Sequence, residues 1–147
     1  MILPIYLYGS EKLRNENAEA DIQDKEGLTK LISDMWETLK AADGCGLAAP
    51  QVGVNLRVVI VDGTDLSDTY EYLHDFRRVM INPVVLEESE DVCDYSEGCL
   101  SVPGIYAEVT RPSKIKVEYY DENFEKVVEE FDRFGCRMVQ HELSHLE

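Results

Sequence analysis

The end of the sequence holds the residues best suited to chemistry, because residues 140–147 read QHELSHLE. His141, Glu142 and His145 form the pattern H-E-x-x-H. In a helix, residues four apart lie one above the other, so the two imidazoles can bind one metal ion. Glu142 can then act as a general base on a water that the metal makes acidic. The motif therefore favours metal-assisted hydrolysis over its plainer interpretation, surface histidines on an acidic helix.

A metal site needs at least a third protein ligand, and proteases of the thermolysin type take a carboxylate from a helix well downstream. Only Leu146 and Glu147 follow His145, so we expect this ligand upstream. Cys99 is the best candidate, and the others are His74, Cys45, Cys93 and Cys136. His74 lies in a polar stretch and is expected to be solvated, whereas Cys93 and Cys136 are expected to be ordinary buried or half-buried thiols.

Two further segments accompany this motif: residues 44–51 read GCGLAAPQ and residues 97–101 read EGCLS. Together with QHELSH at residues 140–145, they resemble peptide deformylases, in the family's order and over nearly the whole chain. The resemblance implies removal of the formyl group from N-formyl-methionine at the N-terminus of newly made proteins, with release of formate. It also implies that Cys99, His141 and His145 bind one divalent metal ion, with Fe²⁺ favoured and Zn²⁺ a less active substitute.

The resemblance also assigns residues to the substrate. Gly46 is expected to lie along it, while the Gln51 amide and the Leu100 backbone N–H donate to the developing oxyanion. An apolar slot for the methionine side chain is expected to be formed by Cys45, Tyr95, Phe134 and Met138.

The chain departs from the family pattern at Ser144, where deformylases usually carry aspartate. We expect the metal ligands to survive this change and an ion pair, for which Arg111 is the candidate partner, to be lost. The family also continues past the second metal histidine, whereas this sequence ends at Glu147. We therefore expect fraying of the last helical turn to compete with holding His145 in place.

Two other functions remain open from the residues. A metallopeptidase that cuts unformylated peptides would use the same water activation, with room for substrate on both sides of the cut. A deformylase-like protein could instead bind metal or formyl-peptides without turnover, because of Ser144 and the short end.

The composition limits the class of protein. There are 30 acidic and 14 basic residues among 147, giving a formal net charge of -16. This charge argues against binding nucleic acid or an anionic membrane. The four cysteines fit a reducing compartment, and the N-terminal residues lack the features of a signal peptide, so we expect a cytoplasmic protein. The partners expected are formyl-methionyl nascent peptides and, transiently, the ribosome. The length predicts one catalytic domain over residues 1–147.

The elements around these motifs predict an α+β fold, in which antiparallel β-sheets pack around a C-terminal metal-binding helix, with an N-terminal amphipathic helix. Apolar residues from Leu28 to Leu39 recur at helical spacing, and that helix should end before Gly44. Strands are expected at residues 56–61, 79–86, 106–111, 114–120 and 124–131, the second of them at an edge or bulged because of Pro83. Residues 102–104 are expected to form a turn.

The last helix combines two apolar faces with a narrow polar stripe. Phe134, Met138, His141 and His145 share one face and Val139, Leu143 and Leu146 the other, while Arg137, Gln140, Ser144 and Glu147 form the stripe. A helix that is apolar on two faces is nearly buried, so we expect it to be embedded between sheets.

Overall fold

The computed structural model describes residues 1–6, 17–99 and 102–147, and for residues 95–99 and 102–108 it describes the backbone. The helices are α2 (Lys25–Ala42) and α3 (Arg133–Ser144). The strands are β1 (Gly46–Ala48), β2 (Val58–Asp62), β3 (Arg77–Glu88), β4 (Val92–Cys99), β5 (Val102–Pro112), β6 (Lys114–Tyr120) and β7 (Lys126–Asp132). Short 3₁₀ helices are η1 (Ala49–Val52), η2 (Thr64–Leu66) and η3 (Glu71–Leu73).

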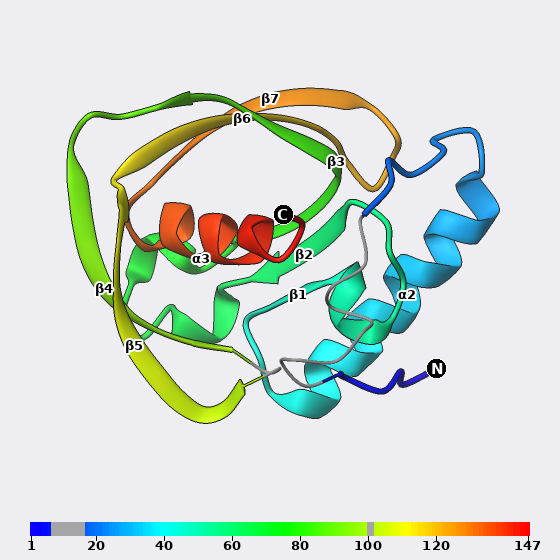
Figure 1. Ribbon diagram of the computed structural model, residues 1–147, viewed down its shortest axis with the longest axis horizontal. Coiled ribbons are helices and arrows are strands. Elements are labelled where there is room, and N and C mark those ends of the chain that lie inside the picture. Colours follow the sequence, from blue (N-terminus) through cyan, green and yellow to red (C-terminus); the bar gives the residue numbers. More distant parts are fainter. Residues whose placement is uncertain (7–16, 100–101) are drawn as a thin grey trace.

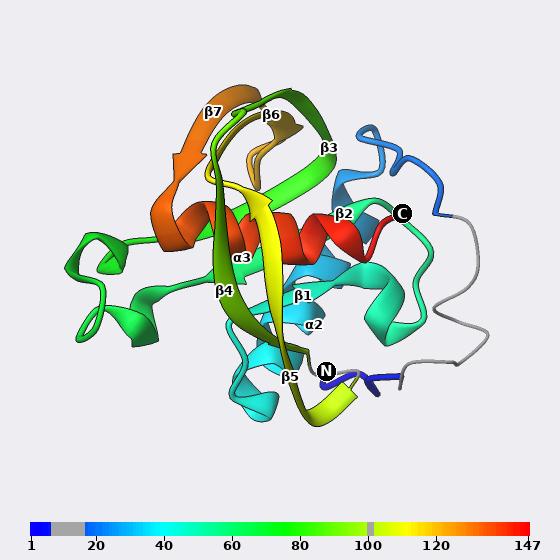
Figure 2. The same ribbon diagram turned by 60° about the vertical axis from the view of Figure 1, so that its left-hand side comes forward.

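All paired strands in the named sheets are antiparallel. Five of them form one sheet in the order β1-β2-β3-β6-β7, and β4 pairs with β5 in a separate sheet of two strands. Figure 1 shows α3 in the middle of the molecule, with the strands curving around it. Figure 2 shows β4 and β5 crossing α3 from a second direction. The predicted α+β fold, with antiparallel sheets around the C-terminal helix, is confirmed.

β2 explains how one sheet serves two hydrophobic cores. Successive side chains of a strand point to opposite faces of its sheet. Val59 and Val61 therefore join the core that contains Val139 and Leu146 of the C-terminal segment. Val58 and Ile60 join the core beneath α2. Because both faces are covered, the strand is a continuous β-branched run rather than an alternation of apolar and polar residues.

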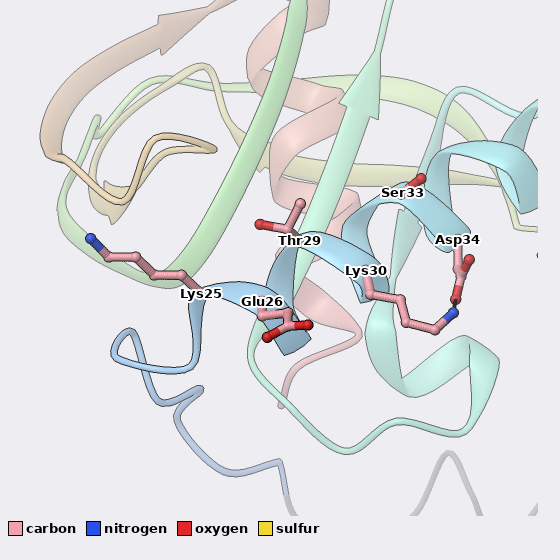
Figure 3. A pocket seen from close by; sticks show the side chains of 6 residues that line it. All are labelled: Lys25, Glu26, Thr29, Lys30, Ser33 and Asp34. Atoms are coloured by element: carbon pink, nitrogen blue, oxygen red, sulfur yellow. Dashed lines mark hydrogen bonds and ion pairs between the residues drawn. The ribbon is translucent and has the colours of Figure 1, made fainter.

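α2 is an amphipathic helix with defined ends. The Asp24 side chain accepts a hydrogen bond from Gly27 N at its start, and Asp43 adopts a left-handed conformation at its end. Its inner face buries Leu28, Ile32, Met35 and Leu39. A shallow hollow on its outer face is lined by Lys25, Glu26, Thr29, Lys30, Ser33 and Asp34, all from this helix (Figure 3). Neither this helix nor any other in the described part of the chain has the length and hydrophobicity to cross a membrane.

One local prediction is confirmed and another is wrong. Of the two alternatives expected for β3, an edge strand or a bulged strand, the bulged one holds: β3 pairs with both β2 and β6, and its ladder shifts register between Ile81 and Val84. At this shift Asn82 has a positive φ of 53°, and its side chain pairs with the backbone N and O of Ala20. Residues 102–104 begin β5 rather than forming a turn. Val102 pairs with Cys99, and Pro103 and Gly104 lie within the register shift that precedes the pairing of Tyr106 with Gly98.

Candidate metal and catalytic site

His141 and His145 turn their imidazoles toward each other on α3. The Nε2 atoms are 3.4 Å apart, and the ring planes meet at 78°. His145 is the C-cap residue immediately after the helix, and its backbone N bonds to Glu142 O. Its φ of -73° and ψ of -11° remain in the right-handed helical region, so the helical stacking of the two side chains continues past the last α-helical residue.

The separation of these nitrogens suits a metal ion. Metal–nitrogen distances of about 2.0–2.1 Å at a tetrahedral angle put two bound nitrogens about 3.3–3.4 Å apart. The observed 3.4 Å matches that value. In their separation, the two nitrogens therefore match one half of a tetrahedral ligand set.

Glu142 lies directly against the backbone of β1. The residue is buried, and a Cβ placed on Gly46 would lie 2.7 Å from both the Cγ and the Oε2 of Glu142. Only glycine permits this approach, because non-bonded carbon atoms ordinarily keep about 3.5–4.0 Å apart. The carboxylate thus packs against β1, on the helix segment that also carries the two histidines.

Gln51 contacts the end of the same short strand. It is buried in η1, and its Oε1 accepts a hydrogen bond of 3.0 Å from the backbone N of Ala48. This contact orients the amide, since its oxygen accepts and its nitrogen donates. Nε2 is therefore the donor end of Gln51, and the contacts of β1 hold both this amide and the Glu142 carboxylate in place.

Three of the expected site residues lie on β4 or directly after it. Cys99 is the last residue of β4, and the structure describes its backbone but not its side chain. The Tyr95 side chain and the whole of Leu100 likewise lie outside the described residues. Among the described residues, no group of three possible metal ligands gathers at one point. The two histidines are thus brought together by the described structure, and the third ligand remains a prediction.

The other candidate ligands have different surroundings. His74 is exposed, as predicted, with 71% of its side chain accessible. Cys136 is buried and Cys93 is half-buried. Burial raises the pKa of Cys136 to about 12, so this sulfur is held as a thiol rather than as the thiolate that binds metals. Burial, followed by the charges of Asp65 and Glu142, also raises the pKa of Cys45.

The remaining candidates for the methionine slot are Phe134, Met138 and Cys45, and only Met138 among them is fully buried. Phe134, at the start of α3, is half-buried and stacks on Tyr70 with ring centroids 4.8 Å apart. Its backbone N donates to the Tyr72 hydroxyl, so η3 and its neighbours cover this end of the helix. Met138 is buried in the core with β2, and the half-buried Cys45 packs against the same core.

The polar stripe of α3 is largely inside the protein. Arg137 and Gln140 are buried, whereas Ser144 is exposed and donates its hydroxyl to the backbone O of His141. The helix is therefore buried on part of its polar stripe as well as on its two apolar faces. The stripe's first half faces other protein elements, and its second half faces solvent.

Side chains from distant segments hold the end of this helix, which sequence reasoning missed. The Leu146 carbonyl accepts hydrogen bonds from Asn17 Nδ2 at 3.1 Å and from Arg57 Nη1 at 3.5 Å. Arg57 also pairs with Glu147. The Leu146 side chain is buried in the core. These contacts oppose the fraying expected around His145, and nothing in the local sequence indicates them because the partners are far apart along the chain.

The whole site lies within a recognisable family. Residues 2–147 match the family model described as polypeptide deformylase. The chain belongs to this family. A peptide deformylase of Christiangramia forsetii is 41% identical over 154 residues, covering 100% of this chain and 78% of the relative.

Solved structures of deformylases share the fold. A probable peptide deformylase from synechococcus phage S-SSM7 is 40% identical with a TM-score of 0.87, covering 99% of this chain and 94% of that one. The peptide deformylase from Thermotoga maritima is 36% identical with a TM-score of 0.88, covering 99% and 92%.

Peptide deformylases are metal-dependent hydrolases that remove the formyl group from N-terminal formylmethionine of nascent peptides. The chain is a hydrolase of this family, and the resemblance seen in its three motifs is confirmed.

Proposed function

We propose that this chain deformylates N-formyl-methionyl peptides with Cys99, His141 and His145 as metal ligands and Glu142 as general base. The observation that supports this best is the 3.4 Å separation of the two histidine Nε2 atoms beside a buried carboxylate. Two imidazoles and a thiolate suit a divalent transition metal. When bound, such a metal makes a water acidic enough to lose its proton near neutral pH.

Glu142 carries the proton through the reaction. It removes a proton from the attacking water, whose oxygen forms a bond to the formyl carbon. As the carbon–nitrogen bond breaks, Glu142 returns the proton to the leaving amine, and the products are formate and a free N-terminus. Gly46 leaves room for the carboxylate to pack closely against β1, which suits a base that must be positioned for both the water and the amine.

Gln51 and Leu100 stabilise the oxygen of the formyl group. Negative charge grows on this oxygen as the water attacks, and preorganised donors in a buried site lower the energy of that state. The Gln51 Oε1 bond to Ala48 N leaves the amide with its Nε2 as donor. An amide serves without adding a charge of its own. The backbone N–H of Leu100 is the second donor.

The substrate lies along Gly46, where the absence of a side chain allows close approach of a peptide. Its methionine side chain enters the slot made by Cys45, Tyr95, Phe134 and Met138. The raised pKa of Cys45 keeps that thiol neutral and therefore compatible with an apolar side chain.

Fe²⁺ is the metal we favour, with Zn²⁺ as the alternative, because a mixed nitrogen and sulfur ligand set accepts both. A thiolate beside Fe²⁺ is open to oxidation, so activity lost in air would support iron. We further propose that residues 1–147 form one catalytic domain that works in the cytoplasm on chains emerging from the ribosome. The net charge of -16 supports a role without nucleic-acid binding or membrane attachment.

The test is formate release from formyl-Met-Ala-Ser by protein purified without oxygen, with metal measured on the same sample. The native chain should release formate and hold about one metal ion per chain. Glu142→Gln should keep the metal and lose about 10²- to 10⁴-fold in turnover. His145→Ala and Cys99→Ala should both lose the metal.

His74→Ala is the matched control, because it removes an exposed histidine that has no assigned role. It should retain both metal and activity. Retention of metal by Cys99→Ala would refute the ligand assignment. Bound metal with no formate would refute the proposed reaction, and cleavage of unformylated peptides would instead indicate a peptidase.

A further inference from the structure

Arg137 is a buried cation whose surroundings have no explanation in the reaction itself. It lies on α3, four residues before His141, and only 2% of it is exposed. Nη1 donates to the carbonyl oxygen of Val109 at 2.8 Å, and Nη2 donates to the carbonyl oxygen of Cys93. Nη2 also lies 3.7 Å from the Cys93 sulfur. One guanidinium therefore joins α3 to both strands of the β4–β5 hairpin.

This hairpin is not part of the large sheet. β4 and β5 pair with each other, while the other five strands form their own ladder. At its base the hairpin is fastened where Ser89 N bonds to Lys114 O and Ser113 N bonds to Asp91 O. The orientation of the hairpin across α3 therefore needs contacts of its own. Two hydrogen bonds, one to each strand, restrain both its position and its rotation.

The geometry of the hairpin amplifies small changes at this contact. Cys93 and Cys99 are both on β4, and six residues of extended strand span about 20 Å. A rotation of about 3° at the base of such a strand moves its far end by about 1 Å. Metal ligands must lie within about 0.2 Å of their proper distances. The angle of the hairpin thus decides whether the Cys99 thiolate can reach a metal held by the histidines.

Arginine is the side chain that can make this contact. Its planar guanidinium presents donors in a rigid fork that can reach two acceptors at once, whereas the lysine ammonium is a compact charge on a flexible stem. The two Arg137 donors reach one carbonyl oxygen on each of two strands that pair with each other. The rigid fork therefore matches acceptors on both strands at once.

We propose that Arg137 is a positioning residue for the metal site, which fixes the Cys99-bearing hairpin relative to the helix that carries His141 and His145. This inference rests on the proposed ligand set. Arg137 does not itself contact the reacting atoms. It acts through the angle at which β4 crosses α3, and therefore mainly on the sulfur ligand rather than on the two imidazoles.

Cobalt binding by the full chain tests this role. Co²⁺ is added to metal-free protein, and its affinity is measured by chelator competition together with the thiolate-to-cobalt charge-transfer absorption. Arg137→Met should bind Co²⁺ about 10- to 100-fold more weakly and lose most of the thiolate absorption. Arg133→Met, which removes an exposed arginine from the same helix, should match the native protein in both.

The melting temperature of the metal-free protein separates positioning from general stability. A purely structural role would lower this temperature and leave the cobalt affinity and absorption of the folded protein unchanged, which would overturn the inference. If Arg137→Met does not fold, Arg137→Lys decides: it keeps the charge but not the fork and should still show weakened thiolate absorption. Native cobalt binding by Arg137→Lys would also overturn the inference. Absence of thiolate absorption in the native protein would refute the proposed ligand set instead.

Discussion

Replacing Gly46 by alanine perturbs the proposed general base without touching it chemically. The new Cβ would lie 2.7 Å from Cγ and Oε2 of Glu142 and 2.8 Å from its Cδ. Carbon atoms in contact ordinarily keep about 3.5–4.0 Å apart, so the carboxylate and the strand must separate by about 1 Å. A displacement of that size at a catalytic group costs about 10²-fold in rate. We therefore expect kcat to fall about 100-fold, equivalent to about 2.7 kcal/mol.

The assay is steady-state formate release with metal content measured on the same sample. Metal content should stay at the native level, because the three atoms nearest to the added methyl group all belong to Glu142 and none to a histidine. Gly63→Ala is the control, since its Cβ would meet Leu73 and Met138 at 3.4 Å, close to ordinary contact. A Gly46→Ala enzyme with full metal and native kcat would refute the role given to the Glu142 position. Loss of metal together with activity would show that α3 itself had moved.

Three further predictions concern the last helix. Arg57→Met removes a donor to the Leu146 carbonyl and should cost about 1 kcal/mol, or about 3–4 °C in Tm, measured by thermal unfolding; an unchanged Tm would show that the contact contributes nothing. Ser144→Asp should increase the fraction of metal that the protein retains in the presence of a chelator, because aspartate at this exposed position restores the family's ion pair. Equal metal retention by the variant and the native protein would show that Ser144 has no effect on metal binding. Because burial raises the pKa of Cys136 from 9.0 to about 12, the folded chain keeps a proton that the unfolded chain loses. Stability from this source is present below about pH 9 and falls as the pH rises toward 12, so the urea midpoint of the native protein should drop more between about pH 8 and pH 10 than that of Cys136→Ala.

The sequence alone was sufficient for features that depend on local spacing. The interval of four between His141 and His145 is a property of the helix, and it places the two imidazoles together wherever the helix lies. The apolar periodicity from Leu28 to Leu39 likewise corresponds to the face that α2 buries. The family also follows from the sequence, because three short motifs kept their order and spacing.

The sequence could not assign burial to the polar stripe of α3 or neighbours to β3. Arg137 reads as one residue of an ordinary polar stripe, yet its partners are carbonyl groups of two strands that precede it in the chain. Pro83 left an edge and a bulge as alternatives, and the structure has the bulge, at Asn82, so that β3 keeps partners on both sides. In each case the deciding contact joins residues that are distant in sequence.

The sequence by itself determined which residues could do chemistry and which helix carries two of them. Only the tertiary structure decided that Glu142 rests on Gly46 and that Arg57 holds the carbonyl of Leu146. The physical reason is that helical spacing is fixed by backbone geometry within a few residues, whereas these contacts depend on how the sheets pack around α3. Packing brings together residues whose separation along the chain carries no signal of their meeting.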